Sequence, residues 1–453
     1  MIGFFKRLFK DRRGNVLAVA AAALPLTVGA AGLATDTIQW TLWKRQLQRA
    51  ADSAAIAGVY DRQAAAGSTS TVSSTVSHDI TLNLHTWMGL KTGYPQISYP
   101  ADSGVKTYQV QVTLAIQQPL PFSSLFMSSA PTIYAVSTAA SLPAGGDACV
   151  QALETSSSQT GIIISGNAGI YMPDCVMYSN SPASNSAYAK GSSAVTAEAV
   201  AAVGGIQESN NWTVDSYRPY SPSLADPFAN VTPSSSDMKC AGHWTAPHGS
   251  NPATWVNDAL TDATDMAAAV DSHGAPANCW TSMSVGSNTT LTVPVSYTGP
   301  IYISGGDATI QGDFRCTGCT IVLTNSDPNS STIGTLKVNA SSDINMTAPT
   351  SGTFRGLAMY QDRRAQTCTN SSCQDSVNGN SGSVIIGAMY FPNQELQYNG
   401  TGNTTATCTM FVARRVNFTG NSTTTNKFKS LADCTAEGLP GGGNVIRMVR
   451  LVA

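Results

Sequence analysis

The hydrophobic pattern of the chain begins with one long apolar run near the N-terminus. Residues 14–35 contain no charged side chain, and about 20 residues at 1.5 Å each span the ~30 Å hydrocarbon layer of a membrane. A signal peptide has a shorter apolar region, typically about 7–15 residues. The pattern therefore predicts a transmembrane helix over residues 15–35, and a cleaved signal peptide is the alternative.

The charges before this run predict its orientation. The basic side chains that precede it are Lys6, Arg7, Lys10, Arg12 and Arg13, and the single acid among them is Asp11. Positively charged flanks of a membrane helix stay on the cytoplasmic side. We therefore expect residues 1–14 in the cytoplasm and the bulk of the chain outside it, as a single-pass membrane protein.

A helical pattern continues beyond the apolar run. No proline occurs in residues 37–66, which follow Asp36, and the first glycine there is Gly58. Apolar residues recur there at spacings of three and four, which is typical of one face of a helix. This helix-packing stripe consists of Trp40, Trp43, Leu47, Ala50, Ala54 and Ala57. It predicts packing either on strands of the same chain or on helices of partner proteins, and the sequence favours neither.

The segment up to residue 146 shows strand patterns after the helical one. Residues 66–80 are rich in Ser and Thr, which predicts a flexible or helix-ending segment. Residues 105–122 alternate in their first half, and residues 90–99 and 132–142 have further strand character. The alternating apolar positions are Tyr108, Val110, Val112 and Leu114. We expect a small antiparallel sheet beside the long helix over residues 36–146, an arrangement that resembles pilin-like architecture.

Residues 147–453 have a different texture, with short apolar triplets separated by Gly, Asn, Asp and Ser. The stretch "IIISGNAGIYMPDC" (162–175) resembles "IYISGGDATIQGDFRC" (301–316), and "AMY" occurs twice. Such repeats predict a right-handed parallel β-helix, with a β-sandwich as the alternative. Residues 207–283 are rich in Pro and Trp and predict an irregular excursion between two β-helical halves. The whole chain is thus expected to be α+β.

Composition supports an extracytoplasmic β-protein. Charged residues make up 11 % of the chain, less than half of the usual ~25 %, and a net charge of −2 gives no indication of a nucleic-acid partner. An even set of ten cysteines predicts disulfides in an oxidising compartment. Many pairings are open, and pairing of neighbours in the sequence predicts Cys149–Cys175, Cys240–Cys279, Cys316–Cys319, Cys368–Cys373 and Cys408–Cys434.

The N-terminal region carries a family resemblance. "RRGNVLAVAAAALPLTVGAAGLATDTIQWTLWKRQLQRAADSAAIAG" combines basic residues before Gly14, an Ala-rich span with Pro25, the acid Asp36 and the block "LQRAADSAAIAG". It resembles the TadE/TadG-like proteins of the Tad (Flp) pilus-assembly system. The resemblance implies a bacterial inner-membrane protein whose C-terminal domain is periplasmic or at the cell surface. It also implies other Tad/Flp pilus-assembly proteins as partners through the N-terminal helix, besides the lipid bilayer.

Two hallmarks of that family are missing from the sequence. Pilin-like members carry a Glu five residues after the processed glycine, whereas Val19 stands five residues after Gly14. Members with a von Willebrand A domain bind metal through an Asp-x-Ser-x-Ser pattern, which is absent here. The resemblance therefore implies neither prepilin-type processing nor that metal site.

The β-rich region shows no convincing catalytic pattern. A catalytic β-helix needs two or three carboxylates placed together. The candidates Asp307, Asp313, Asp343, Asp362 and Asp375 form no recognisable pair. Asp362 is followed by two arginines, which predicts an ion pair at a coil edge. The group Cys240, His243, His248, His273 and Cys279, and the Cys-x-x-Cys at Cys316, match no standard zinc module.

These observations predict a structural protein without catalytic residues, metal or cofactor. We expect a minor pilin-like or envelope-anchoring component of Tad/Flp-type pilus assembly. One alternative is a carbohydrate-active β-helix protein of the cell envelope. Another is an adhesin that binds glycan through the excursion at residues 207–283.

Overall fold

The computed structural model divides the chain into two compact units. Unit 1 comprises Met1–Pro143 and Met448–Ala453, and unit 2 comprises Ala144–Arg447. The structure describes residues 15–245, 253–297, 299–367, 374–378, 380, 382–399, 408–420, 423–425, 434–440 and 446–452. The α+β class expected from the sequence is confirmed, since a long helix and an antiparallel sheet form unit 1 and parallel strands dominate unit 2.

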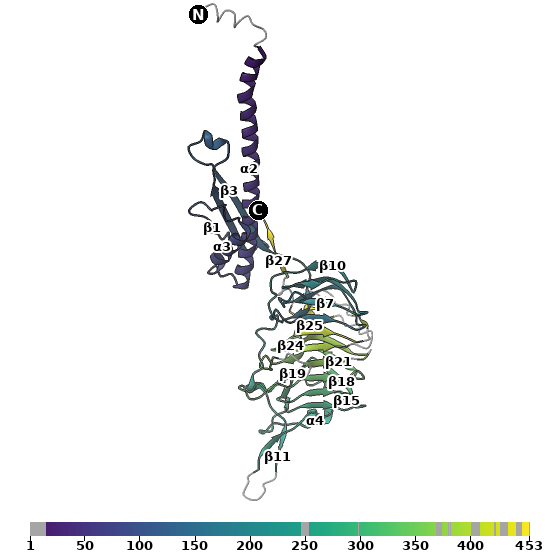
Figure 1. Cartoon of the computed structure of the whole chain (residues 1–453). Coiled ribbons are helices and arrows are strands. Elements are labelled where there is room, and N and C mark those ends of the chain that lie inside the picture. The colour runs from purple at the N-terminus through teal and green to yellow at the C-terminus, as the bar shows by residue number, and fades with distance from the viewer. Residues whose placement is uncertain are drawn as a thin grey trace, which may run out of the picture. The chain divides into compact units, whose positions relative to one another are not determined.

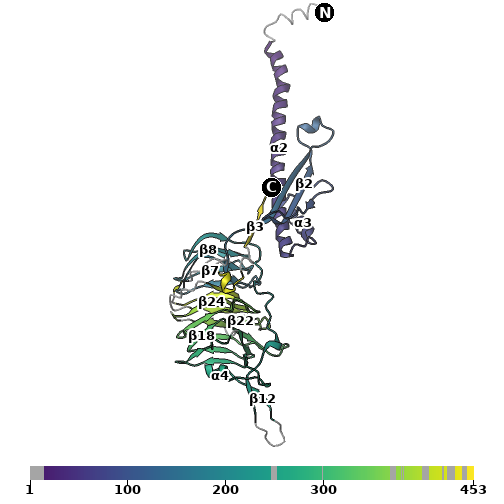
Figure 2. The same ribbon diagram turned by 180° about the vertical axis from the view of Figure 1, so that it is seen from behind.

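Unit 1 is built around one helix, α2 (Asn15–Ala64), which runs for 50 residues without interruption. A shorter helix, α3 (Val72–Asn83), and a four-stranded sheet lie along the C-terminal half of α2 in both views (Figures 1 and 2). The sheet has the order β1-β2-β3-β27. Its strands are β1 (Gln96–Ser98), β2 (Thr107–Gln117), β3 (Thr132–Pro143) and β27 (Arg447–Leu451).

The core of unit 1 forms where α2 meets the sheet. Leu47, Ala50 and Ala54 of α2 are fully buried and belong to one cluster with Val110 and Leu114 of β2. Small side chains let the helix approach closely, and a Cβ added at position 58 would lie 3.0 Å from a methyl group of Val110. The buried side of α2 therefore packs on strands of its own chain.

Two features of unit 1 differ from the expectation. Residues 66–80 were expected to be a flexible or helix-ending segment. Helix α2 does end just before it, at Ala64, but α3 begins within it at Val72, because Val72, Val76 and Ile80 recur every four residues and are buried. The C-terminus was expected in the β-rich domain, yet β27 is hydrogen-bonded beside β3 and Val452 N–H donates to the carbonyl of Thr138 at 2.9 Å. Both features depend on contacts between segments that are distant in sequence.

Unit 2 is a parallel β-helix whose strands stack in ladders. In the lower part of the stack every third strand pairs in parallel, as β13 does with β16 and β16 with β19. In chain order its strands are β4 (Ala148–Ala152), β5 (Ile162–Ile164), β6 (Gly169–Ser179), β7 (Ala187–Ala189), β8 (Ala194–Ala202), β9 (Ile206–Gln207), β10 (Trp212–Arg218), β13 (Cys279–Trp280), β14 (Met283–Val285), β15 (Thr290–Thr292), β16 (Gly299–Ser304), β17 (Ala308–Ile310), β18 (Asp313–Thr317), β19 (Cys319–Thr324), β20 (Leu336–Val338), β21 (Ile344–Thr347), β22 (Leu357–Gln361), β23 (Gln374–Val377), β24 (Val384–Tyr398), β25 (Thr409–Phe418) and β26 (Thr423–Thr425).

The coils are not stacked in chain order. One face of the stack reads β13-β16-β19-β22-β24-β25-β4-β6-β8-β10. The C-terminal strand β25 thus pairs with the N-terminal strands β4 and β5, and we call this junction the seam. In Figure 1 the colour accordingly changes from the blue of β7 directly to the yellow of β25. The two segments on either side of the seam form one continuous β-helix.

The excursion is shorter than the sequence indicates. Its expected bounds were 207–283, but β10 still pairs with β8 and β13 already pairs with β16. The irregular part is confined to residues 219–278. It contains the hairpin β11 (Gly242–Trp244) and β12 (Trp255–Asn257) and the short helix α4 (Ala263–Ala268).

Residues 221–239 of the excursion, which we call the strap, run across the seam. Asn180, which follows β6, exchanges hydrogen bonds with Leu224 at 2.8 and 2.9 Å. On the other side of the seam, the Tyr390 hydroxyl donates to Asp226 at 2.8 Å and the Tyr360 hydroxyl to the carbonyl of Val231 at 2.9 Å. Asp226 also forms an ion pair with Arg363. The strap therefore fastens the two segments to each other.

Candidate membrane and assembly interface

The N-terminal half of α2 exposes apolar side chains. Among the described residues one helix is long and apolar enough to cross a membrane, and it is this one. Its large apolar side chains before Asp36 are exposed at Val19, Leu24, Leu26, Val28 and Leu33. Exposed apolar side chains along a helix of this length suit a hydrocarbon environment better than water.

Asp36 ends the apolar run and ties it to the sheet. Its carboxylate is buried and accepts hydrogen bonds from the backbone N–H of Phe122 at 2.8 Å and of Ser123 at 2.5 Å, and from the Ser123 hydroxyl. Burial raises the pKa of Asp36, but these hydrogen bonds outweigh it and hold the pKa below its ordinary value. Asp36 is part of the family resemblance, yet its partners lie more than 80 residues away and were not foreseen.

The helix-packing stripe lies mainly against the chain's own sheet. Trp43, Leu47, Ala50 and Ala54 are buried, whereas Ala57 is half-buried and Trp40 is 41 % exposed. Outside the stripe, just beyond the span, Ile38 and Leu42 of α2 are exposed. These two residues are four positions apart and share one helix face. This face, and not the buried stripe, is open to a partner.

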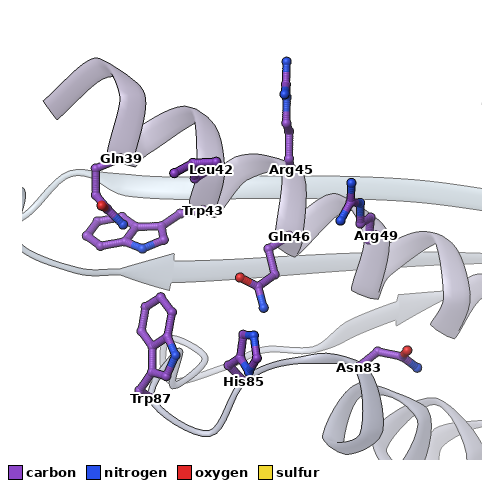
Figure 3. A pocket seen from close by; sticks show the side chains of 9 residues that line it. All are labelled: Gln39, Leu42, Trp43, Arg45, Gln46, Arg49, Asn83, His85 and Trp87. Carbon is purple, nitrogen blue, oxygen red and sulfur yellow. The ribbon is translucent and has the colours of Figure 1, made fainter. Parts of the chain in front are cut away.

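A hollow of about 530 Å³ lies beside that face, between α2 and residues 83–87. Trp43 and Trp87 form its apolar end, with ring centroids 6.3 Å apart, and Gln46 extends toward His85 (Figure 3). Trp87 is exposed, and within the described part of the chain the indole N–H of Trp43 has no hydrogen-bond partner. Arg45 and Arg49 extend away from the two indoles in Figure 3. The hollow combines aromatic surface with an unsatisfied donor.

The cysteines are placed in pairs. Four of the five sequence-adjacent pairs form disulfides, namely Cys149–Cys175, Cys240–Cys279, Cys316–Cys319 and Cys408–Cys434. The pair Cys368–Cys373 lies outside the described residues. The disulfide between Cys240 and Cys279 lies at the end of the strap. Nearby, the His243 ring contacts the Asp258 carboxylate at 2.8 Å. His248 also lies outside the described residues.

The carboxylates considered for catalysis each have structural partners. Asp307 accepts hydrogen bonds from Thr335, and Asp313 and Asp343 both contact Arg315. Asp362 pairs with Arg364 at 2.7 Å, as the sequence indicated.

Asp375 differs from these carboxylates because it is completely buried. Its carboxylate accepts the N–H of Leu336 at 2.7 Å. Burial raises the pKa of Asp375 well above its ordinary value. The five candidate carboxylates are therefore held in the turns and ladders of unit 2.

Taken together, the molecule combines a membrane-length helix and a small antiparallel sheet with a disulfide-bonded parallel β-helix. Residues 14–66 match the family model described as "Putative Flp pilus-assembly TadE/G-like". The N-terminal region is therefore a TadE/G-like domain, and the protein has a role associated with Flp pilus assembly. No curated protein and no solved structure matches the chain. The apolar helix and the Tad domain together indicate a membrane-anchored protein.

Proposed function

We propose that the protein is a structural, membrane-anchored component of Tad/Flp-type pilus assembly, with a minor pilin-like or envelope-anchoring role. The observation that carries this proposal is the family match over residues 14–66, which coincides with the membrane-length part of α2 and its continuation on the sheet. Its N-terminus would be cytoplasmic and its β-helix extracytoplasmic, in the inner membrane. The five basic residues before the span support this orientation.

Other pilus-assembly proteins would bind the exposed face of α2. Ile38 and Leu42 are exposed and lie outside the apolar run, and Leu42 also lines the hollow together with Trp87. Exposed apolar patches of this kind mark interaction sites. The buried residues of the stripe, from Trp43 to Ala54, already pack with β2 and β3 and are not available to a partner helix.

Replacement of Ile38 and Leu42 by Asp tests this arrangement. We expect the double variant to be exported and folded, because both side chains are exposed, but to lose its in-membrane cross-links to other pilus proteins and to stop pilus assembly. Val136→Asp is the matched control, since Val136 is an exposed apolar residue on β3. Normal assembly and cross-linking by the double variant would contradict the proposed contact.

Protease treatment of spheroplasts tests the topology. External protease should digest unit 2, and a mature N-terminus beyond Ala34 or full protection of unit 2 would exclude the proposed anchor.

A non-enzymatic role also predicts that Asp307→Asn, Asp313→Asn and Asp362→Asn leave pilus assembly nearly intact. Loss of assembly by one of these variants, while it is still folded and exported, would favour an enzyme.

Adhesion is a second candidate function, favoured by the hairpin β11–β12. Trp244 and Trp255 lie with ring centroids 5.4 Å apart on this hairpin, and Trp244 is exposed. Exposed Trp side chains offer apolar faces together with a polar N–H, which suits recognition surfaces. Glycan-array binding by the full-length protein that disappears in Trp244→Ala would support an adhesin.

A further inference from the structure

The loop between β2 and β3 carries an exposed apolar tip. Leu125, Phe126 and Met127 are 74 %, 76 % and 49 % exposed. No charged residue occurs between Lys106 and Asp147, so nothing in this stretch of the chain opposes contact with an apolar phase. Three consecutive exposed apolar side chains of this size are unusual for a loop in water and indicate an interface.

The loop is fastened to α2 at a defined height. The ring of Phe122 fills the space above Gly32 so closely that a Cβ there would lie 2.3 Å from it. One helical turn further along, Asp36 holds the backbone of Phe122 and Ser123. Phe126 packs on Phe122 with ring centroids 5.3 Å apart. The exposed tip is therefore positioned beside residues 32–36 of α2.

The contacts of β3 with α2 show at which end of the sheet the β2–β3 loop lies. Along β3, the carbonyl of Tyr134 accepts a hydrogen bond from Lys44 and that of Val136 accepts one from Gln48. The sheet thus follows α2 away from Gly32, and the loop is its end nearest the N-terminal half of the helix, as both views show (Figures 1 and 2).

The level of Gly32 and Asp36 along α2, where the loop is held, coincides with the end of the expected transmembrane span. Residues 15–35 rise by ~32 Å along a helix, which matches the ~30 Å hydrocarbon layer. Gly32 and Asp36 then lie where the acyl chains meet the headgroups. Ile38 and Trp40 are exposed just beyond this level, and Trp is enriched in that layer of membrane proteins.

We propose that the β2–β3 loop is a second membrane contact, in which Leu125, Phe126 and Met127 insert into the interfacial layer of the lipid bilayer beside α2. The inference rests on the membrane anchoring proposed above. It assigns a lipid partner to unit 1, which is then held to the bilayer at two places. Gly32 and Asp36 are the positioning residues, because they set the depth of the loop on the helix.

Photo-cross-linking of the full-length protein tests the contact. The amino acid p-benzoylphenylalanine is placed singly at Phe126, at Leu26 in the span, or at Tyr134, and each protein is reconstituted in vesicles of phosphatidylethanolamine and phosphatidylglycerol. Tyr134 is an exposed residue of β3 beside Lys44, ~12 Å beyond Asp36 along the helix. We expect lipid adducts at Leu26 and Phe126, several-fold above the yield at Tyr134.

The outcomes separate this inference from the anchoring itself. A lipid adduct at Leu26 without one at Phe126 overturns the loop contact and leaves the anchor intact, and so does a protein adduct at Phe126 in place of lipid. Absence of a lipid adduct at Leu26 overturns both. In Gly32→Leu, which displaces Phe122, we expect the adduct at Phe126 to fall several-fold while that at Leu26 persists. An unchanged yield at Phe126 contradicts the positioning by Gly32.

Discussion

Arg363 offers the sharpest test of how the two β-helical segments are held together. Its guanidinium forms an ion pair with Asp226 of the strap at 2.9 Å and donates to the carbonyl of Phe228 at 2.5 Å. It also lies 5.2 Å from the ring centroid of Tyr390 in β24. Arg363→Ala removes these three contacts at once, while the backbone carbonyl of Arg363 keeps its bond to Asn393.

The expected loss follows from the burial of the partner. The Asp226 side chain is only 16 % exposed, and breaking a fully buried pair costs about 3–5 kcal/mol. The Tyr390 hydroxyl and the Phe228 N–H still donate to Asp226 in the variant, and Arg363 itself is partly exposed. We therefore expect a loss of ~2–3 kcal/mol in the free energy of unfolding, close to that of a hydrogen bond to a charged group plus its stacking.

Arg315→Ala is the matched control. The Arg315 side chain is exposed to a similar degree, but its partners Asp313 and Asp343 are more accessible than Asp226. Surface pairs of this kind contribute about 0–1 kcal/mol. If exposure of the arginine alone decided the effect, the two variants would behave alike.

Thermal unfolding of the full-length protein in detergent, followed by the β-sheet circular dichroism signal, measures the difference. For a unit of this size ~2–3 kcal/mol corresponds to a shift of roughly 4 °C in Tm. Hydrogen exchange should also increase in peptides that cover the strap. An effect of Arg363→Ala no larger than that of Arg315→Ala, with unchanged exchange in the strap, would refute the role assigned to this ion pair.

Three further predictions concern α2, the buried carboxyl and the disulfides. Ala54→Pro should destabilise unit 1 by ~3 kcal/mol or more, because proline lacks the N–H and clashes in a helix interior; pilus counts and proteolysis of unit 1 would show it. Burial raises the pKa of Asp375 in the folded state well above its ordinary value near 3.8. The contribution of Asp375 to the free energy of unfolding is therefore fully present below pH ~3.8 and is lost as the pH rises toward the folded-state pKa. Asp375→Asn should therefore gain stability relative to the natural protein between pH 4 and pH 8 in denaturant titrations, and equal pH profiles would contradict this. Non-reducing peptide mapping should find Cys368 joined to Cys373 besides the four described pairs, and free thiols would argue against an oxidising compartment.

The sequence alone was sufficient for features that depend on neighbouring residues. The absence of charge over residues 14–35 and the stripe through Leu47 and Ala54 predicted α2, because helical periodicity is visible in a single segment. The strands β2 and β3 were likewise predicted, β2 from the alternation of its apolar residues. The last two residues of the matching "AMY" segments stack on each other, Met359 beside Met389 and Tyr360 beside Tyr390, after a shift in register. In each case the residues that make the contact recur at regular spacing within a single segment of the chain.

The resemblance between residues 162–175 and 301–316 shows where local pattern stops being informative. Both begin with a strand followed by a glycine with positive φ, Gly166 and Gly305. Yet β5 pairs with β7 and β25, whereas β16 pairs with β13 and β19, so the two strands lie in different ladders. Every coil of a β-helix presents a similar edge, and the pattern of one coil does not specify which coil stacks on it.

Only the tertiary structure decided the order in which the coils of the β-helix stack, the course of the strap and the position of the β2–β3 loop on α2. The seam joins β25 to β4, the strap joins Asp226 to Arg363, and Asp36 holds Ser123. Each of these contacts links residues about 90 to 260 positions apart, and its geometry arises only when separate elements have packed. The residues at these junctions have no distinctive sequence pattern. Their role comes from burial and from partners far away in the chain, and neither is visible in a short stretch of sequence.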